Sequence, residues 1–218
     1  ISATVSAGLA DGKTIGQGLE EMDKIASETL DDTFRTALSG DSKDYRESSS
    51  SLMFAFILAL VLIYLILAAQ FESFKDPFII MLTVPLAIAG ALIFMFAGGI
   101  TMNIFSQIGI IMLIGLVAKN GILIVEFANL KQESGEDKMA AIRNAALQRL
   151  RPILMTSVST ILGLIPLAFA TGEGANQRIA MGTAVVGGML VSTLLTMYIV
   201  PAIYTYISTN RKVKTETV

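Results

Sequence analysis

The chain has 218 residues, of which 53% are hydrophobic and 16% are charged, and its formal net charge is −2. This apolar share exceeds the roughly 45–50% that is usual in soluble domains, and the near-neutral charge does not suggest a nucleic-acid partner. The chain has no Cys, His or Trp, which excludes disulfides, thiol redox chemistry, most zinc sites and a Ser-His-Asp triad. We therefore expect a membrane protein that is not an enzyme and that has neither a metal site nor a cofactor.

Residues 1–47 predict a small α/β unit. Apolar and polar residues alternate over 1–9, which is typical of a half-buried strand, and 32–38 could form a second strand. Between them, Thr14 and Gln17 have the spacing of a capping box at the start of a helix. Such a unit buries too little surface to be stable alone, so we expect it to pack on further chain.

Five apolar stretches follow, each close to the roughly 20 residues that cross a bilayer. One such run could be a core helix of a soluble protein, but five in succession indicate a polytopic, mainly α membrane protein. The longest run is divided at the Gly98-Gly99 pair. The predicted membrane domain covers 48–209, a tail covers 210–218, and the five spans are 52–69, 77–97, 103–128, 152–171 and 179–207.

Basic residues predict the orientation of these spans, because loops rich in Lys and Arg stay in the cytoplasm. The connecting loops on one side of the membrane have Arg178 as their only basic residue, so this side is expected to face out of the cytoplasm. The tail and the 129–151 loop are then expected in the cytoplasm, and residues 1–47 outside it. The chain begins with Ile1 and has no signal peptide, so we expect it to be a piece of a longer protein. The basic residues on the cytoplasmic side are Lys75, Lys131, Lys138, Arg143, Arg149, Arg151, Arg211, Lys212 and Lys214.

Lys119 is the strongest candidate for a functional residue. It lies about nine residues from the end of the third span, or roughly 13 Å along a helix axis, which is too deep for easy snorkelling. A lysine at this depth costs about 2.5–3.5 kcal/mol on insertion scales, so it should face protein or water. Burial disfavours its charged form and a nearby carboxylate favours it, so either a proton relay or a structural ion pair would suit Lys119.

Four other polar residues have ordinary explanations from the sequence alone. Asn120 could orient Lys119 or simply join two helices by hydrogen bonds. Glu126 is close enough to the membrane surface to be solvated. Thr156 would bond to its own helix backbone, and Arg149 would anchor the span at the membrane face. The segment 137–150 has the spacing of a short amphipathic helix on the cytoplasmic surface.

Three long motifs, beginning at Glu47, Gly115 and Gln148, resemble the C-terminal half of resistance–nodulation–division (RND) efflux pumps of the multidrug branch. They read ESSSSLMFAFILALVLIYLILAAQFESFKDP, GLVAKNGILIVEFANL and QRLRPILMTSVSTILGLIPLAFATG. The resemblance covers essentially the whole chain. It implies that the five spans correspond to the last five of twelve helices, and that residues 1–47 end a periplasmic porter domain.

The resemblance also implies a function. The family consists of secondary active drug/proton antiporters in the inner membrane of Gram-negative bacteria. They are homotrimers that work with a periplasmic adaptor and an outer-membrane channel. By motif position, the family's relay lysine, arginine and threonine correspond to Lys119, Arg149 and Thr156. The relay aspartates belong to the missing N-terminal half of the protomer.

Other interpretations remain open at this point. An RND-type exporter of other cargo, such as lipid or metal, would have a similar membrane domain, although the AKNGILIVEFA pattern makes the metal branch the weaker choice. A non-transporting assembly subunit would need only this half. Apart from membrane lipid and the rest of the protomer, no ligand is indicated by the residues themselves.

Overall fold

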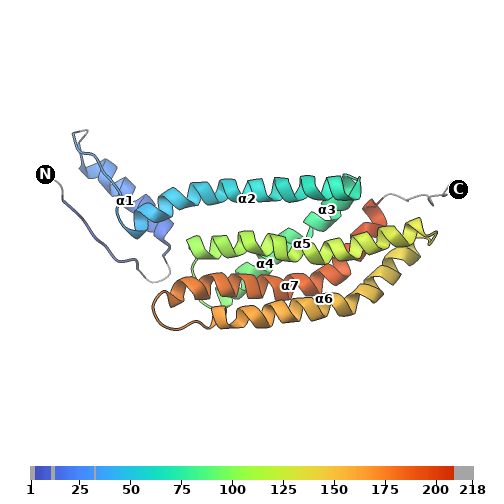
Figure 1. The fold of residues 1–218 in the computed structure, drawn as a ribbon. Helices are drawn as coiled ribbons and strands as arrows, with labels where there is room; N and C mark the ends of the chain where they lie inside the picture. The colour runs from blue at the N-terminus through green and yellow to red at the C-terminus, as the bar shows by residue number, and fades with distance from the viewer. Residues whose placement is uncertain (1–2, 11–12, 32, 209–218) are drawn as a thin grey trace.

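The computed structural model describes residues 3–10, 13–31 and 33–208. It is a bundle of long helices with a smaller N-terminal part at one end (Figure 1). Five stretches are long and apolar enough to cross a membrane, so the predicted number of spans is confirmed. The helices are α1 (Ile15–Thr29), α2 (Asp41–Phe71), α3 (Lys75–Met81), α4 (Thr83–Ala97), α5 (Ile104–Glu133), α6 (Lys138–Ala168) and α7 (Ala175–Ile207).

The N-terminal part contains the predicted helix but not the predicted strands. Thr14 Oγ1 accepts a hydrogen bond from the Gln17 amide at 3.3 Å, and the Gln17 side chain accepts one from the Thr14 amide, which confirms the capping box. The strand predictions for 1–9 and 32–38 are wrong for the residues that the structure describes there. A strand needs a neighbour for its backbone hydrogen bonds, and the described chain offers none.

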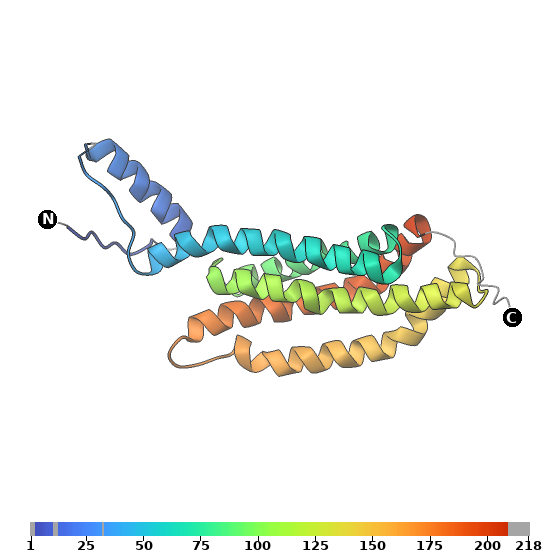
Figure 2. The same cartoon turned by 45° about the horizontal axis from the view of Figure 1, so that its top comes forward.

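This N-terminal part stands apart from the bundle. In both views α1 projects beyond the near end of α2 (Figures 1 and 2). Apolar side chains in it, such as Val5 and Phe34, are exposed. The predicted tail at the other end, 210–218, lies outside the described residues.

The second span is two helices in sequence, α3 and α4, joined at Leu82. Pro85 has no N–H to give to the Met81 carbonyl, and its ring disfavours continuous helix at that point, which explains why α3 ends at Met81. Thr83 Oγ1 donates to the Ile80 carbonyl at 2.7 Å at this junction. The break lets α3 and α4 each pack on α5 and α7.

The predicted surface helix at 137–150 is not a separate element. It is the first part of α6, which runs without interruption through Pro152 to Ala168. Ala141, Ile142 and Ala145 are buried, so this part packs against protein along one face. Figure 1 shows that α6 bends in its yellow part. The helix contains Pro152, and a proline inside a helix removes a hydrogen bond and favours a bend.

Helix α7 lies at the centre of the bundle and packs on α3, α4, α5 and α6. Glycines allow this close approach: a Cβ on Gly182 would lie 2.5 Å from the backbone nitrogen of Ala168. By contrast, α2 is peripheral, since only Leu67 and Phe71 among its apolar side chains are fully buried. The core is therefore formed by the five helices α3, α4, α5, α6 and α7, and α2 lies at its edge.

Candidate functional site

Lys119 lies on a face of α5 that the described chain leaves uncovered. Between Ile104 and Val125 it is the only charged residue of the helix. Its side chain is exposed and makes no hydrogen bond or ion pair with any other described residue. Further exposed residues recur at helical spacing on the same stripe of α5: Ile108, Met112, Gly115, Glu126 and Leu130.

Asn120, the next residue, points into the bundle. It is 3% exposed, and its Nδ2 donates to Ser157 Oγ at 3.2 Å and to Thr193 Oγ1 at 3.4 Å. These two bonds join α5 to α6 and α7 in the middle of the membrane. Buried polar groups in lipid must find such partners inside the protein, so Asn120 fixes the rotation of α5 and with it the direction of the Lys119 side chain.

Thr156 is at the same level as Lys119 on the neighbouring helix. Asn120 and Ser157 are hydrogen-bonded, so Lys119 and Thr156, which adjoin them in sequence, lie at one height on α5 and α6. The Thr156 side chain is exposed, and its hydroxyl donates to the Ile153 carbonyl at 3.1 Å. The structure thus brings two predicted site residues to one level without placing them in contact.

Arg149 is two turns closer to the loop that joins α5 and α6. Its guanidinium carbon lies 4.4 Å from the centre of the Phe127 ring on α5, a cation–π distance. Its Nε is buried and has no hydrogen-bond partner among the described residues. Arg149 is therefore held over an aromatic face, and it does not contact Lys119 or Thr156.

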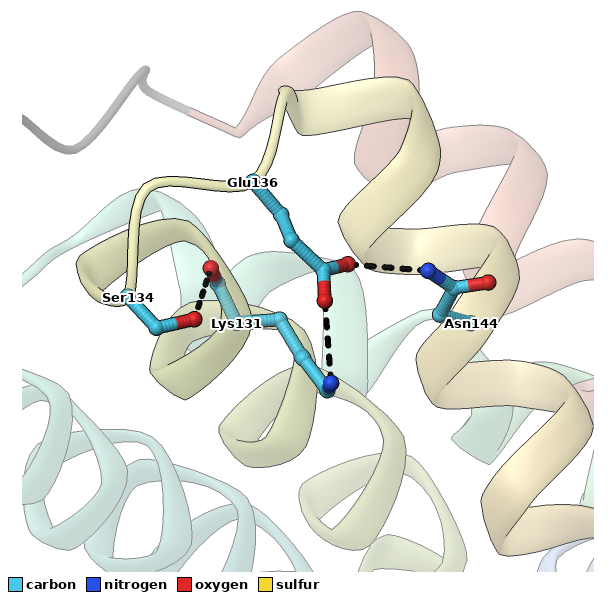
Figure 3. A network of polar contacts seen from close by, with 4 residues as sticks. All are labelled: Lys131, Ser134, Glu136 and Asn144. Carbon is cyan, nitrogen blue, oxygen red and sulfur yellow. Dashed lines mark hydrogen bonds and ion pairs between the residues drawn. The ribbon is translucent and has the colours of Figure 1, made fainter.

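The loop between α5 and α6 carries a separate polar cluster, drawn in Figure 3. Lys131 Nζ donates to Glu136 Oε1 at 2.9 Å, and Asn144 Nδ2 donates to Glu136 Oε2 at 2.9 Å. The pKa of Glu136 is below its ordinary value of 4.5, mainly because of the hydrogen bond from Lys131 and, to a smaller extent, the one from Asn144. The carboxylate thereby joins the end of α5 to the start of α6.

The lowered pKa gives this loop a predictable pH dependence. A carboxylate with a lowered folded-state pKa stabilises the fold above its ordinary pKa and loses that contribution as pH falls through the folded value. We expect Glu136→Gln to speed amide hydrogen exchange across residues 131–144 at pH 7, and the difference from wild type to shrink as the pH is lowered below the ordinary carboxyl value of 4.5. Comparison at equal pH cancels intrinsic exchange rates. Glu72→Gln, at an exposed carboxylate, should have no effect there, and equal exchange in Glu136→Gln and wild type at pH 7 would contradict the prediction.

A buried polar network at the same end of the bundle was not predicted. Asp76 of α3 is 2% exposed; it accepts from Asn129 Nδ2 at 3.0 Å and from Ser208 Oγ at 3.4 Å. Tyr204 donates its hydroxyl to Asn129 Oδ1 and accepts from Gln132 Nε2 at 2.8 Å. Helices α3, α5 and α7 are therefore joined by side-chain hydrogen bonds around one carboxylate.

The described residues contain no group of three or more acidic side chains that could hold a metal ion. Glu126 lines a small hollow of about 120 Å³ with Gln70 and Glu133, and it lies two turns from Lys119. Within the described part of α5, Lys119 is thus the one charge between Ile104 and Val125, and its side chain is exposed.

Comparison with known proteins agrees with this membrane architecture. The chain is 38% identical over 218 residues to an uncharacterized transporter of Haemophilus influenzae, covering 97% of this chain and 21% of that protein. It is 39% identical over 199 residues to the toluene efflux pump membrane transporter TtgB of Pseudomonas putida, covering 91% of this chain and 19% of TtgB. It is 40% identical over 196 residues to the multidrug resistance protein MdtF of Escherichia coli K12, covering 89% and 19%.

The chain thus spans about a fifth of the length of these curated relatives. Residues 1–208 also match the model of the AcrB/AcrD/AcrF family. This match covers nearly all of the chain, including the five spanning helices and the segment before them. The chain is therefore a multi-pass membrane protein segment that belongs to the AcrB/AcrD/AcrF family of RND efflux transporters.

Proposed function

We propose that this chain is the C-terminal part of a proton-driven exporter of hydrophobic or amphiphilic compounds in the inner membrane of a Gram-negative bacterium. The observation that carries the proposal is Lys119, a single charge in the middle of a span, on the uncovered stripe of α5. A lysine at such a depth faces protein or a water-filled cavity rather than lipid. The stripe is therefore a surface for the rest of the transporter.

In this proposal Lys119 takes part in the proton relay. Carboxylates from the rest of the protomer face its ammonium group across the stripe. When a carboxylate takes up a proton, the pair loses its attraction and the helices can move relative to one another. Proton entry thereby drives a change of shape that moves cargo.

The other proposed relay residues support Lys119 in different ways. Asn120 holds the rotation of α5 through Ser157 and Thr193. Thr156 presents a hydroxyl at the level of Lys119 and can exchange its bond to the Ile153 carbonyl for one to a relay group. Arg149 supplies positive charge two turns away, on the side from which protons would leave.

The proposed orientation places the α5–α6 loop in the cytoplasm and residues 1–47 in the periplasm. Basic residues gathered at the loop end support this orientation. Residues 1–47 would end a porter domain. We further propose that the complete protein is a homotrimer that works with a periplasmic adaptor and an outer-membrane channel.

The test is transport by the complete protein in liposomes. An imposed pH gradient should drive a fluorescent amphiphilic drug across the vesicle membrane, and an ionophore that collapses the gradient should stop it. Drug movement that is independent of the gradient would contradict proton coupling. Gradient-driven movement of lipid or metal cargo, with no movement of the amphiphilic drug, would instead favour the exporters of other cargo.

A further inference from the structure

Helix α6 has a hollow on its flank, beside residues 146–153. The hollow has a volume of about 190 Å³ and opens between α5, α6 and α7. Its wall is apolar except for one tyrosine hydroxyl. The lining residues are Ile124, Ala146, Leu147, Leu150, Ile153, Met197 and Tyr198.

The rim of this hollow faces outward from the bundle. Leu147 is 65% exposed and Tyr198 is 76% exposed, so the hollow is open to whatever surrounds this end of the helices. Leu147 and Leu150 are within a turn of the basic residues that mark the membrane boundary on α6. If α6 spans a membrane, these two leucines lie at the depth of the phospholipid glycerol groups and the first carbons of the acyl chains.

Basic side chains flank the hollow along the same helix. Arg143 precedes Leu147 by one turn, and Arg151 follows it by one turn. Both are exposed, and neither forms a hydrogen bond or ion pair with any other described residue. Helix α6 contains no Asp or Glu between Lys138 and Ala168, so nothing on the helix itself neutralises these two charges.

We propose that this hollow and the two arginines form a binding site for an anionic phospholipid. One acyl chain lies in the hollow against Leu147, Leu150 and Met197. The phosphate group sits between Arg143 and Arg151, where guanidinium groups can bind phosphate oxygens in pairs. The positive charges of the two arginines complement the negative phosphate. The apolar wall of the hollow lies next to them, where the acyl chain of the bound lipid would begin.

This site does not include Lys119, although the proposed relay residue Arg149 lies on the same stretch of α6, between Leu147 and Leu150. Lys119 lies on the uncovered stripe of α5, whereas the hollow is reached from the α6–α7 side through Tyr198 and Leu147. The proposed site also does not depend on whether the α5–α6 loop is in the cytoplasm or the periplasm. It requires only that the membrane leaflet next to this loop contains anionic phospholipid. Binding can therefore be measured without transport.

Native mass spectrometry of the complete transporter in detergent tests the site. Wild type should bind added phosphatidylglycerol more tightly than phosphatidylcholine with the same chains. Arg143→Gln with Arg151→Gln should remove this preference, with binding weakened about fivefold for each arginine, as expected from about 1 kcal/mol per basic residue at an anionic surface. Arg35→Gln, at an exposed arginine outside the spans, should leave the preference unchanged.

Further measurements separate the possible occupants. Ala146→Phe, which fills the hollow, should weaken binding of both lipids, and glycerol phosphate without acyl chains should not compete with them. A photo-crosslinking residue in place of Leu147 should give adducts of lipid mass in membranes. An unchanged preference in the double arginine variant, full competition by glycerol phosphate, or adducts of protein mass would each overturn the proposal.

Discussion

Replacing Lys119 with Ala should abolish proton-coupled export in the complete transporter, down to the level of empty vesicles. The charge is alone in the first two thirds of α5 and its side chain is exposed, so in the proposed relay its removal leaves the facing carboxylates without this cation. Packing within the described chain should be unaffected, because Lys119 bonds to none of its other described residues. Proton flux and drug movement in liposomes measure the effect, and the amount of folded protein in the membrane controls for expression.

Lys119→Arg distinguishes a relay from a structural ion pair. Arginine keeps its proton at every physiological pH, so it can preserve an ion pair but cannot release a proton. A relay therefore predicts that Lys119→Arg also fails, whereas an ion pair predicts substantial activity. Lys131→Ala, in which the lost cation belongs to the loop cluster with Glu136, should retain transport. Full activity of Lys119→Ala would contradict both roles.

Local patterns predicted the parts of the structure that depend on local physics. The five spans follow from length and hydropathy, and the Thr14–Gln17 cap follows from residues three positions apart. The strands failed because a strand is stable only when another strand pairs with it, and no such partner lies among the described residues. The continuity of α6 through Pro152 was missed because a charged amphipathic start and an apolar remainder look like two elements in sequence.

The site shows the same division. Lys119 could be selected from sequence because a charge inside an apolar run is conspicuous. The Asp76 network could not, because its bonds join residues 53 and 132 positions apart. From sequence, Asp76 merely marks the edge of a span. The only available hints were Asn129 and Gln132, two amides one turn apart near the end of α5, which would need a partner if buried.

Replacing Asp76 with Ala should markedly destabilise the transporter. The carboxylate accepts from Asn129 and Ser208, and each buried donor left without an acceptor costs about 1–3 kcal/mol. Release from the cost of burying a charge offsets part of this loss, so we expect a net loss of about 2 kcal/mol. The melting temperature of the purified protein in detergent, followed by light scattering, should fall clearly. Lys75→Gln, at the exposed neighbouring residue, should not change it.

Asp76→Asn separates loss of acceptors from loss of charge. Its amide oxygen can face Asn129 Nδ2, while its NH₂ group can donate to the Ser208 hydroxyl, which accepts as well as donates. Both contacts then survive without a buried charge, so this variant should melt much closer to wild type than Asp76→Ala. If the two variants melt together, the charge itself matters more than the hydrogen bonds. In that case the cation to examine is Lys138, because its Nζ donates to the carbonyl of Ser208 at 2.6 Å and the Ser208 hydroxyl donates to Asp76.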